Sequence, residues 1–228
     1  MPKVFASQAL PKGGRLGIVT FTGGVGVVII DGGAKYGLGL TEEFQDLFEM
    51  PKVFASQALP KGGRLGIVTF TGGVGVVIID GGAKYGLGLT TLSAETRQAF
   101  DGIYQGLGTM PVDIGPMMAA VKDPFDIYPR VIEAVAEDSN VDVMFNVLWA
   151  NPTGVIISSY LKAYERIKDR VRKPIATWVY GPNSEVAADL TKRVEEMGFP
   201  VFNSPEKCIR ALGLAYQYSR IRNRGNTL

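Results

Sequence analysis

The chain has 228 residues, of which 46% are hydrophobic and 20% are charged, and its formal net charge is +2. This length allows one good-sized core with little room for a second domain, and the net charge is too small to argue for nucleic acid or an anionic membrane as a partner. Histidine is absent and Cys208 is the single cysteine, which excludes a His-based catalytic triad, a Cys-rich zinc site and an internal disulfide.

The first feature along the chain is a repeat. Residues 1–41 recur without a single change as residues 50–90. A solenoid needs three or more units, and nothing after Thr90 repeats. Perfect identity indicates a very recent or an engineered duplication, because old repeats keep only their core positions.

The flanking sequence indicates which copy belongs to the fold. The second copy runs on into Thr91–Thr96, a strand end followed by a capped helix start, whereas the first runs into Glu42–Phe48, an amphipathic lead-in to the second copy. We therefore assign the domain to residues 42–228 and regard residues 1–41 as a surplus strand and helix. An isolated pair of elements is marginal in water, so we expect this surplus to pack on another chain or on a sheet edge and make a homo-oligomer.

Strands and helices alternate after the repeat. Strands are predicted at 64–70, 87–92, 141–149, 175–180 and 200–202, and helices at about 74–84, 94–104, 123–137, 153–172, 185–197 and 205–222. Ser93, Ser204 and the stop at Gly198 supply typical helix ends. This alternation predicts an α/β fold with a doubly wound parallel sheet of about five strands in a flavodoxin-like order.

The turn Thr71-Gly72-Gly73-Val74-Gly75 follows the first strand of the predicted domain. Bare amides at a helix N-terminus attract an anion, which makes these five residues a candidate phosphate site. The alternative is that the glycines only permit a tight turn and close packing of helix on strand. No Walker lysine follows, so direct nucleotide binding of that kind is not expected.

Polar residues follow other strands at the same predicted edge. Asp113, Asn151, Gly181 and Asn183 are expected to line a crevice there, because open α/β sheets place ligands at the carboxyl ends of their strands. Each has a structural alternative, an Asx turn for Asp113 and helix caps for the Asn-Pro and Gly-Pro-Asn turns. Cys208, Trp149 and Trp178 are interpreted as packing residues. We predict no catalytic side chain and no metal ligand in this chain.

No apolar run approaches the roughly 20 residues that cross a bilayer. Met1-Pro2-Lys3 is not followed by the apolar core of a signal peptide. We therefore expect a cytoplasmic protein with no membrane partner.

Five stretches, taken in order, resemble one family. They are Leu59 to Gly75, Pro111-Val112-Asp113, Glu137 to Asp142, Arg172-Lys173-Pro174-Ile175, and Gly198 to Glu206. Together they are similar to the C-terminal flavodoxin-like domain of NDP-forming acyl-CoA synthetases, with succinyl-CoA synthetase as a more distant relative. The chain departs from the family at Met110, where an Asn usually precedes Pro-Val-Asp.

The resemblance implies a domain of an ADP-forming acyl-CoA synthetase, an acid-thiol ligase. In that family a preceding domain carries the phosphorylated histidine and binds CoA, and an ATP-grasp domain binds the nucleotide. ATP or ADP, CoA and Mg²⁺ would then belong to the full enzyme and none to this chain alone, which would be inactive when isolated. The alternative is a non-catalytic binding or assembly module of the same fold. A response-regulator sensor is a third, disfavoured because no paired acidic residues follow the first strand.

Overall fold

The computed structural model describes residues 16–21, 25–30, 49–152 and 156–225. The chain forms two compact units, Met1–Pro51 and Lys52–Leu228. The predicted lead-in at 42–48 lies outside the described residues.

The described part of the first unit is a β-hairpin. Strand β1 (Leu16–Phe21) pairs antiparallel with β2 (Val25–Ile30), so that Leu16 lies opposite Ile30 and Phe21 opposite Val25. The prediction of a helix after the strand in this first copy is therefore wrong at residues 25–30, and the remainder of that predicted helix lies outside the described residues.

The second copy of the same residues folds differently. Strand β3 (Arg64–Thr69) is followed by helix α3 (Gly72–Ala83), so the sequence Val-Gly-Val-Val-Ile-Ile is a strand at 25–30 and helical at 74–79. β-Branched residues have only a weak helix preference, and packing decides their structure. In the second copy Ile78 is fully buried, and a Cβ built at Gly82 would lie 3.2 Å from Leu65 and 3.4 Å from Ile209.

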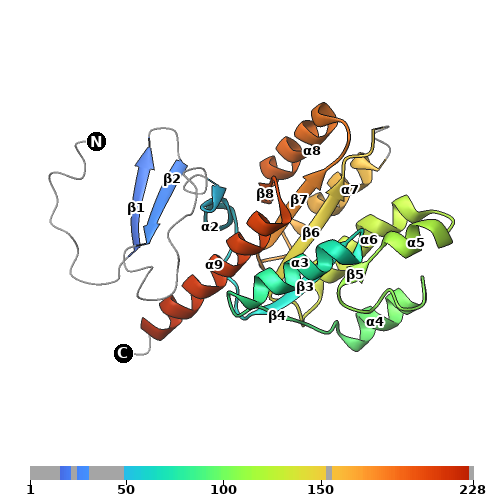
Figure 1. The fold of residues 1–228 in the computed structure, drawn as a ribbon, viewed down its shortest axis with the longest axis horizontal. Coiled ribbons are helices and arrows are strands. Elements are labelled where there is room, and N and C mark those ends of the chain that lie inside the picture. Colours follow the sequence, from blue (N-terminus) through green and yellow to red (C-terminus); the bar gives the residue numbers. More distant parts are fainter. Residues whose placement is uncertain (1–15, 22–24, 31–48, 153–155, 226–228) are drawn as a thin grey trace, which may run out of the picture. The chain divides into compact units, whose positions relative to one another are not determined.

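The second unit contains a parallel sheet in the order β4-β3-β6-β7-β8. Its other strands are β4 (Gly88–Leu89), β5 (Val112–Asp113), β6 (Val143–Trp149), β7 (Ile175–Tyr180) and β8 (Val201–Phe202). Strand β5 also pairs with β3, at Val68 and Thr69, whereas β4 pairs with Arg64 and Leu65. The two short strands thus share one side of β3, and the five sheet positions have the flavodoxin-like order. The predicted fold class is confirmed (Figure 1).

The predicted strand at 87–92 is shorter in the structure because Asn140 engages the residues after β4. The Thr90 hydroxyl donates to the Asn140 carbonyl at 2.8 Å, and Asn140 Nδ2 donates to the Thr91 carbonyl at 3.1 Å. Strand β5 was not predicted, since two residues give no periodic signal.

The remaining helices are α2 (Lys52–Ser56), α4 (Ala94–Asp101), α5 (Gly115–Ala120), α6 (Pro124–Glu137), α7 (Ile157–Ile167), α8 (Ser184–Glu196) and α9 (Pro205–Gly225). Every predicted helix of the second unit is present, and α2 and α5 are additional. Helix α7 is shorter than predicted, and residues 153–155, where it was expected to begin, lie outside the described residues. Among the described helices, none is both long and apolar enough to cross a bilayer.

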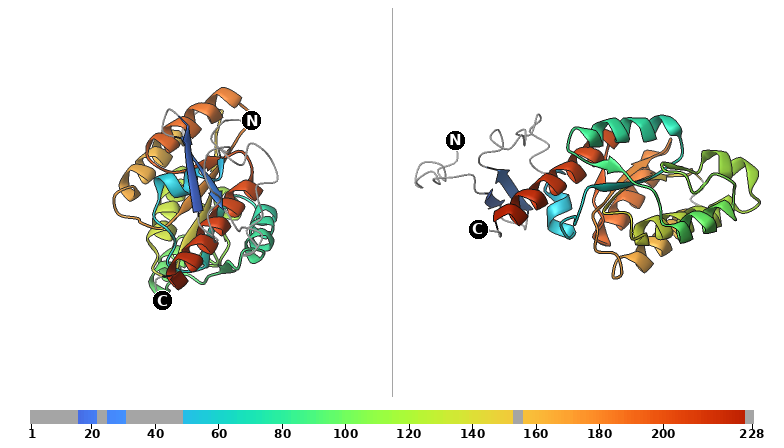
Figure 2. Two further views of the ribbon diagram at one scale, coloured as in Figure 1. Left: turned by 90° about the vertical axis from the view of Figure 1, so that its left-hand side faces the viewer. Right: turned by 90° about the horizontal axis from the view of Figure 1, so that it is seen from below.

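The helices of this unit cover both faces of the sheet. Helices α3 and α9 pack together on one face, and α6 and α7 pack together on the other with α8 beside α7 (Figure 2). Glycines allow α9 to approach closely, because a Cβ at Gly81 would lie 2.7 Å from Ile209 and one at Gly213 would overlap Tyr85. The α3 start is thereby held at the carboxyl edge of the sheet.

Candidate functional site

The start of α3 is fixed by two threonines. Buried Thr69, at the end of β3, donates its hydroxyl to the Thr71 carbonyl at 3.1 Å and accepts from the Thr71 N–H at 3.2 Å. Thr71 is the N-cap, and its side chain accepts from the Val74 N–H at 3.4 Å. The turn is therefore held by its own hydrogen bonds and is preorganised.

This helix start is open to solvent. Thr71, Gly72 and Gly73 are exposed, and a Cβ built at Gly73 would meet no atom within 4 Å. The Gly72 and Gly73 N–H groups precede the first intrahelical bond, which Gly75 makes to Thr71 at 3.4 Å. With the dipole of a 12-residue helix behind them, these two amides have the chemistry of an anion site.

The last two residues of the predicted run lie deeper. Gly75 is buried, and a Cβ there would lie 3.1 Å from Pro111. Val74 is half-buried. Gly75 thus has the packing role that was the alternative interpretation, whereas Gly72 and Gly73 present amides to solvent.

Asp113 lies beside this opening. Its Oδ1 accepts from the Gly115 N–H at 2.9 Å, which makes the Asx-type turn that sequence analysis gave as the alternative. Its Oδ2 lies 3.7 Å from a Cβ built at Gly72. A carboxylate near a helix N-terminus is stabilising by about 0.3–1 kcal/mol, and its negative charge also opposes an anion that approaches the same amides.

The other three predicted residues lie at the ends of β6 and β7. Asn183 caps α8 by accepting from the N–H groups of Glu185 at 3.0 Å and Val186 at 3.2 Å. Asn151 is 8% exposed, and Gly181 packs so tightly that a Cβ would overlap the Ala150 carbonyl oxygen. Asn183 therefore has the capping role that sequence analysis gave as its alternative. A crevice lined by Asp113, Asn151, Gly181 and Asn183 stays a prediction.

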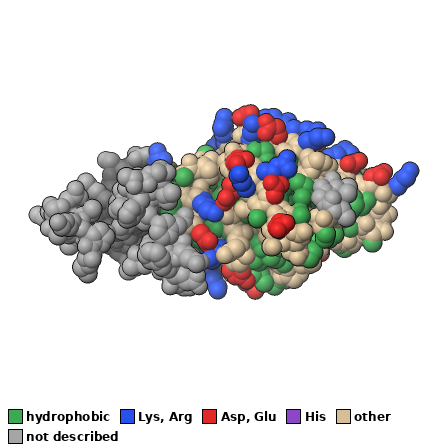
Figure 3. Space-filling view, turned by 90° about the horizontal axis from the view of Figure 1, so that it is seen from above, with side chains coloured by type: hydrophobic (Ala, Val, Ile, Leu, Met, Phe, Trp, Pro, Cys, Tyr) green, Lys and Arg blue, Asp and Glu red, His purple; other side chains and the backbone are tan. Residues whose placement is uncertain are grey.

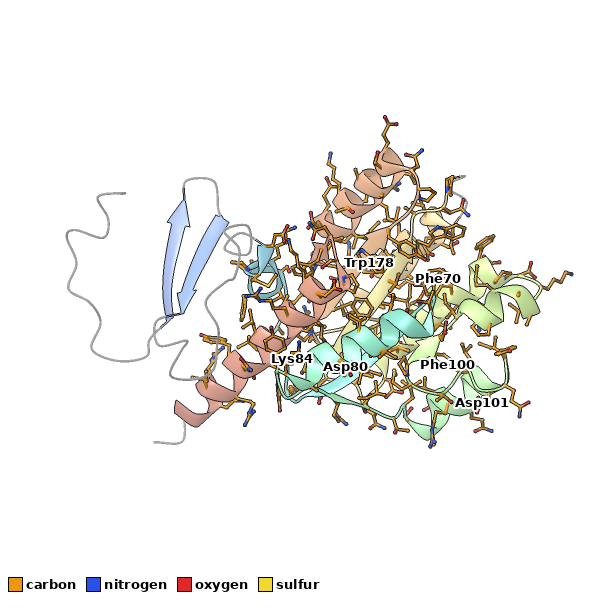
Figure 4. The ribbon with its side chains drawn as sticks, in the orientation of Figure 1. Phe70, Asp80, Lys84, Phe100, Asp101 and Trp178 are labelled. Atoms are coloured by element: carbon orange, nitrogen blue, oxygen red, sulfur yellow. The ribbon has the colours of Figure 1, made fainter. Side chains whose placement is uncertain are left out.

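An aromatic cluster lies beneath this edge of the sheet. The Phe70 ring packs edge-on against Tyr128 at 4.7 Å and Trp149 at 6.3 Å, and Tyr128 packs against Tyr160 at 5.2 Å. Figure 4 places Phe70 near the start of α3, with Asp80 further along that helix and Lys84 at its C-cap. Burial raises the pKa of both Tyr128 and Tyr160 well above the ordinary value, so both phenols are neutral and supply no charge. Sequence analysis predicted packing for Trp149 but did not identify the cluster.

A groove between α7 and α8 was not predicted. It is lined by Ser158, Leu161, Lys162, Glu165, Arg166, Arg193, Glu196 and Met197. The charged residues of this groove have both signs. Figure 3, which views the molecule from above, shows basic and acidic side chains interspersed over that face. Such a mixture does not select an anionic ligand. Among the described residues, no three Cys, Asp or Glu side chains gather as a metal site would require.

Comparison with known proteins shows that the chain is similar to an ADP-forming ligase. No protein-family model matches the chain. Over 112 residues the chain is 32% identical to acetate–CoA ligase [ADP-forming] II of Archaeoglobus fulgidus, a match that covers 49% of this chain and 16% of the ligase. The sequence is thus homologous to part of an ADP-forming synthetase, as the resemblance implied.

Solved structures share the fold. A protein of Pyrococcus horikoshii OT3 superposes with a TM-score of 0.67 at 22% identity, over 82% of this chain and 42% of that one. The dinucleotide forming acetyl-coenzyme A synthetase 1 of Ca. Korarchaeum cryptofilum superposes at 0.65 with 21% identity, over 82% of this chain and 40% of that one in its apo form. The chain spans less than half the length of these proteins.

Proposed function

We propose that residues 52–225 are the flavodoxin-like domain of an ADP-forming acyl-CoA synthetase, and that the start of α3 faces a phosphate group carried by another domain. The single observation that carries the proposal is the open pair of amides at Gly72 and Gly73. The homology to an acetate–CoA ligase supports it, because that relative is named as ADP-forming.

The contribution of this domain is electrostatic. Amide dipoles that are fixed before the charge arrives stabilise it without reorganisation. The turn at Thr71 is held by Thr69, so its amides meet this condition. The proposal assigns this chain no acid, base or nucleophile at this place, and the Asp113 carboxylate beside the opening already accepts a hydrogen bond from the Gly115 N–H. The phosphate and its histidine, the CoA and the nucleotide with Mg²⁺ belong to partner domains in this proposal.

The outer face of α3 supports the existence of such a partner. Val76 is 57% exposed and Val77 is 41% exposed on this helix, and Leu89 of the adjoining β4 is 41% exposed. The adjacent exposed side chains Val76 and Val77, about one turn after Gly73, favour an interaction surface at this end of the helix. A domain that covers this face would also reach the open end of α3. The same surface is compatible with the alternative, a non-catalytic assembly module.

A phosphate titration followed at the backbone amides tests the proposal. We expect saturable shifts at Gly72 and Gly73, and much smaller ones at Glu185 and Val186, whose amides are already capped by Asn183. Chloride at matched ionic strength is the reference. Equal responses at the two helix starts would contradict a site at α3.

Two substitutions at one position sharpen the test. Gly72→Pro removes one N–H donor yet suits the first position of a helix, and the extended Thr71 (φ −147, ψ 138) is compatible with a following proline. Gly72→Ala keeps the donor and is its matched control. We expect phosphate binding to weaken severalfold in Gly72→Pro only.

The enzyme assignment is tested in a chimera. Residues 52–225 would replace the matching domain of the Archaeoglobus ligase, with either Gly72→Ala or Gly72→Pro in place. Formation of ATP from acetyl-CoA, ADP and phosphate, with release of acetate and CoA, in the first chimera but not in the second supports the assignment. Equal activity of the two argues for the assembly module.

A further inference from the structure

The sheet has one place for a β3–α3–β4 unit, and the chain carries two identical copies of its sequence, residues 1–41 and 50–90. We propose that the chain exchanges between two registers. In the register of the structure residues 50–90 occupy this place, and in the second register residues 1–41 occupy it and residues 42–90 are displaced.

Identical residues make the same contacts in either register. The buried side chains of Leu65, Ile67 and Ile78 have Leu16, Ile18 and Ile29 as their counterparts. Gln57, whose Oε1 accepts from the Ile175 N–H at 2.8 Å, has Gln8 as its counterpart. The packing free energy of the core is therefore the same, and the two registers differ only in how the chain is connected.

The connection favours the register of the structure. In the second register residues 42–90 form a loop between Thr41 and Thr91. Closing a loop of that length lowers the population on the order of 300-fold, as the three-halves power of its number of residues. The loop leaves from an accessible place, because β4 is an edge strand and Thr91 is exposed.

The hairpin of β1 and β2 does not change the relative populations of the two registers. The described strands β1 and β2 show that the duplicated sequence can pair with itself as a hairpin. When residues 50–90 are displaced they can form the same hairpin, so that contribution cancels between the registers. The second register is thus a minor state, which becomes the major one when the second copy is damaged.

The experiment places one charge in each copy. Ile67→Asp buries a carboxylate in β3, where Ile67 is 0% exposed, and Ile18→Asp is the matched substitution in the first copy. Urea unfolding is followed through the reactivity of Cys208, which is the only cysteine of the chain and is buried in α9. We expect Ile18→Asp to leave the unfolding equilibrium of this unit unchanged. Ile67→Asp should lower the folding constant on the order of 300-fold, which is less than the loss in the double variant, where Cys208 should be unprotected.

Limited trypsin digestion reads the register directly. The measure is the rate of cleavage at Lys61 and Arg64 relative to that at Lys12 and Arg15, the matching positions of the first copy. In Ile67→Asp this ratio should rise above its wild-type value, since residues 42–90 are then outside the fold. Protein concentration should not matter, because the exchange is within one chain.

Four results would overturn the proposal. The first is an Ile67→Asp variant that is no more stable than the double variant, and the second is a double variant that remains folded. The third is an Ile67→Asp chain that keeps the wild-type cleavage ratio, and the fourth is one that regains its fold only as concentration rises.

Discussion

The Met110 sulfur accepts a hydrogen bond from the backbone N–H of Ile67 at 3.1 Å. Strand β4 pairs with β3 at Arg64 and Leu65 and β5 pairs with it at Val68 and Thr69, so this N–H lies between the two short strands. Met110 thus fills a gap in the sheet. At this position the resembled family usually has Asn, whose amide oxygen could accept the same bond.

Met110→Leu should destabilise the protein by about 1–2 kcal/mol, because the N–H of buried Ile67 loses its acceptor while side-chain volume is conserved. Met144→Leu is the matched control, since Met144 is fully buried in the neighbouring strand. Urea unfolding measures both. Equal losses would show that the sulfur contact contributes nothing beyond packing.

Asp113→Asn should strengthen phosphate binding at α3 severalfold. The substitution removes a negative charge beside Gly72, and an Asn oxygen can still accept from Gly115. One charge a few ångströms away is worth roughly 1 kcal/mol in water. A titration followed at the Gly72 and Gly73 amides measures the change. Weaker binding would instead indicate that the carboxylate holds the turn in its binding geometry.

Tyr164→Phe should cost about 1–3 kcal/mol of stability. The Tyr164 hydroxyl accepts from Asn146 Nδ2 at 2.8 Å and lies 2.7 Å from Thr177 Oγ1, and all three residues are buried. Burial raises the pKa of Tyr164 to about 12, so the neutral phenol makes these bonds at pH 7.

Tyr160→Phe is the control for this cost. Within the described residues, the buried Tyr160 hydroxyl has no hydrogen-bond partner of ordinary geometry, and a contact with the Trp149 backbone only partly offsets the rise of its pKa on burial. Its removal should therefore cost less stability than removal of the Tyr164 hydroxyl. Thermal unfolding compares the pair. A larger loss at Tyr160 would show that its hydroxyl is bonded in solution.

Acid should weaken the fold through Asp142. Hydrogen bonds from Arg64 hold the pKa of Asp142 below its ordinary value, with Arg64 Nε 2.8 Å from Asp142 Oδ2. A lowered carboxyl pKa stabilises the fold above the unfolded value of about 3.9, and this contribution is lost as pH falls through the folded pKa.

Asp142→Asn should therefore lower stability at pH 7, and its effect should vanish once the pH has fallen below the folded pKa of Asp142. We expect no more than about 1 kcal/mol, because the Arg64 side chain is 50% exposed and solvent screens the pair. Urea midpoints at several pH values measure this. A loss that persists in acid would point to packing in place of charge.

Gly213→Ala should destabilise by about 1–3 kcal/mol through overpacking, because its methyl group would overlap the Cβ and the ring of Tyr85. Gly73→Ala, with nothing within 4 Å of the new methyl group, should be neutral or stabilising by up to about 1 kcal/mol. A lower thermal midpoint for Gly213→Ala than for Gly73→Ala would show that α9 packs as closely in solution as it does in the structure.

The sequence predicted the alternation of elements because caps, glycine stops and apolar runs are local signals. It could not predict the fate of Val25–Ile30, whose residues are the same as those of Val74–Ile79. Only the surroundings differ, so no local rule distinguishes the helix from the strand. Strand β5 was missed for a related reason, since its two residues pair only because β4 ends early.

The candidate site was predicted in part. The amides of Gly72 and Gly73 follow from a glycine turn between a strand and a helix, which sequence shows directly. The packing role of Gly75 depends on Pro111, and the closeness of Asp113 to Gly72 depends on the pairing of β5 with β3. Such contacts between distant residues leave no periodic pattern in one sequence.

Helix α9 follows all the strands in chain order and packs against α3 and against β6, β7 and β8. During synthesis, α9 must therefore emerge from the ribosome before the side of the sheet that it covers can be buried. Until then Ile67 and its neighbours on that side remain open to chaperones, and the nascent chain stays vulnerable to aggregation however well its other half has already collapsed.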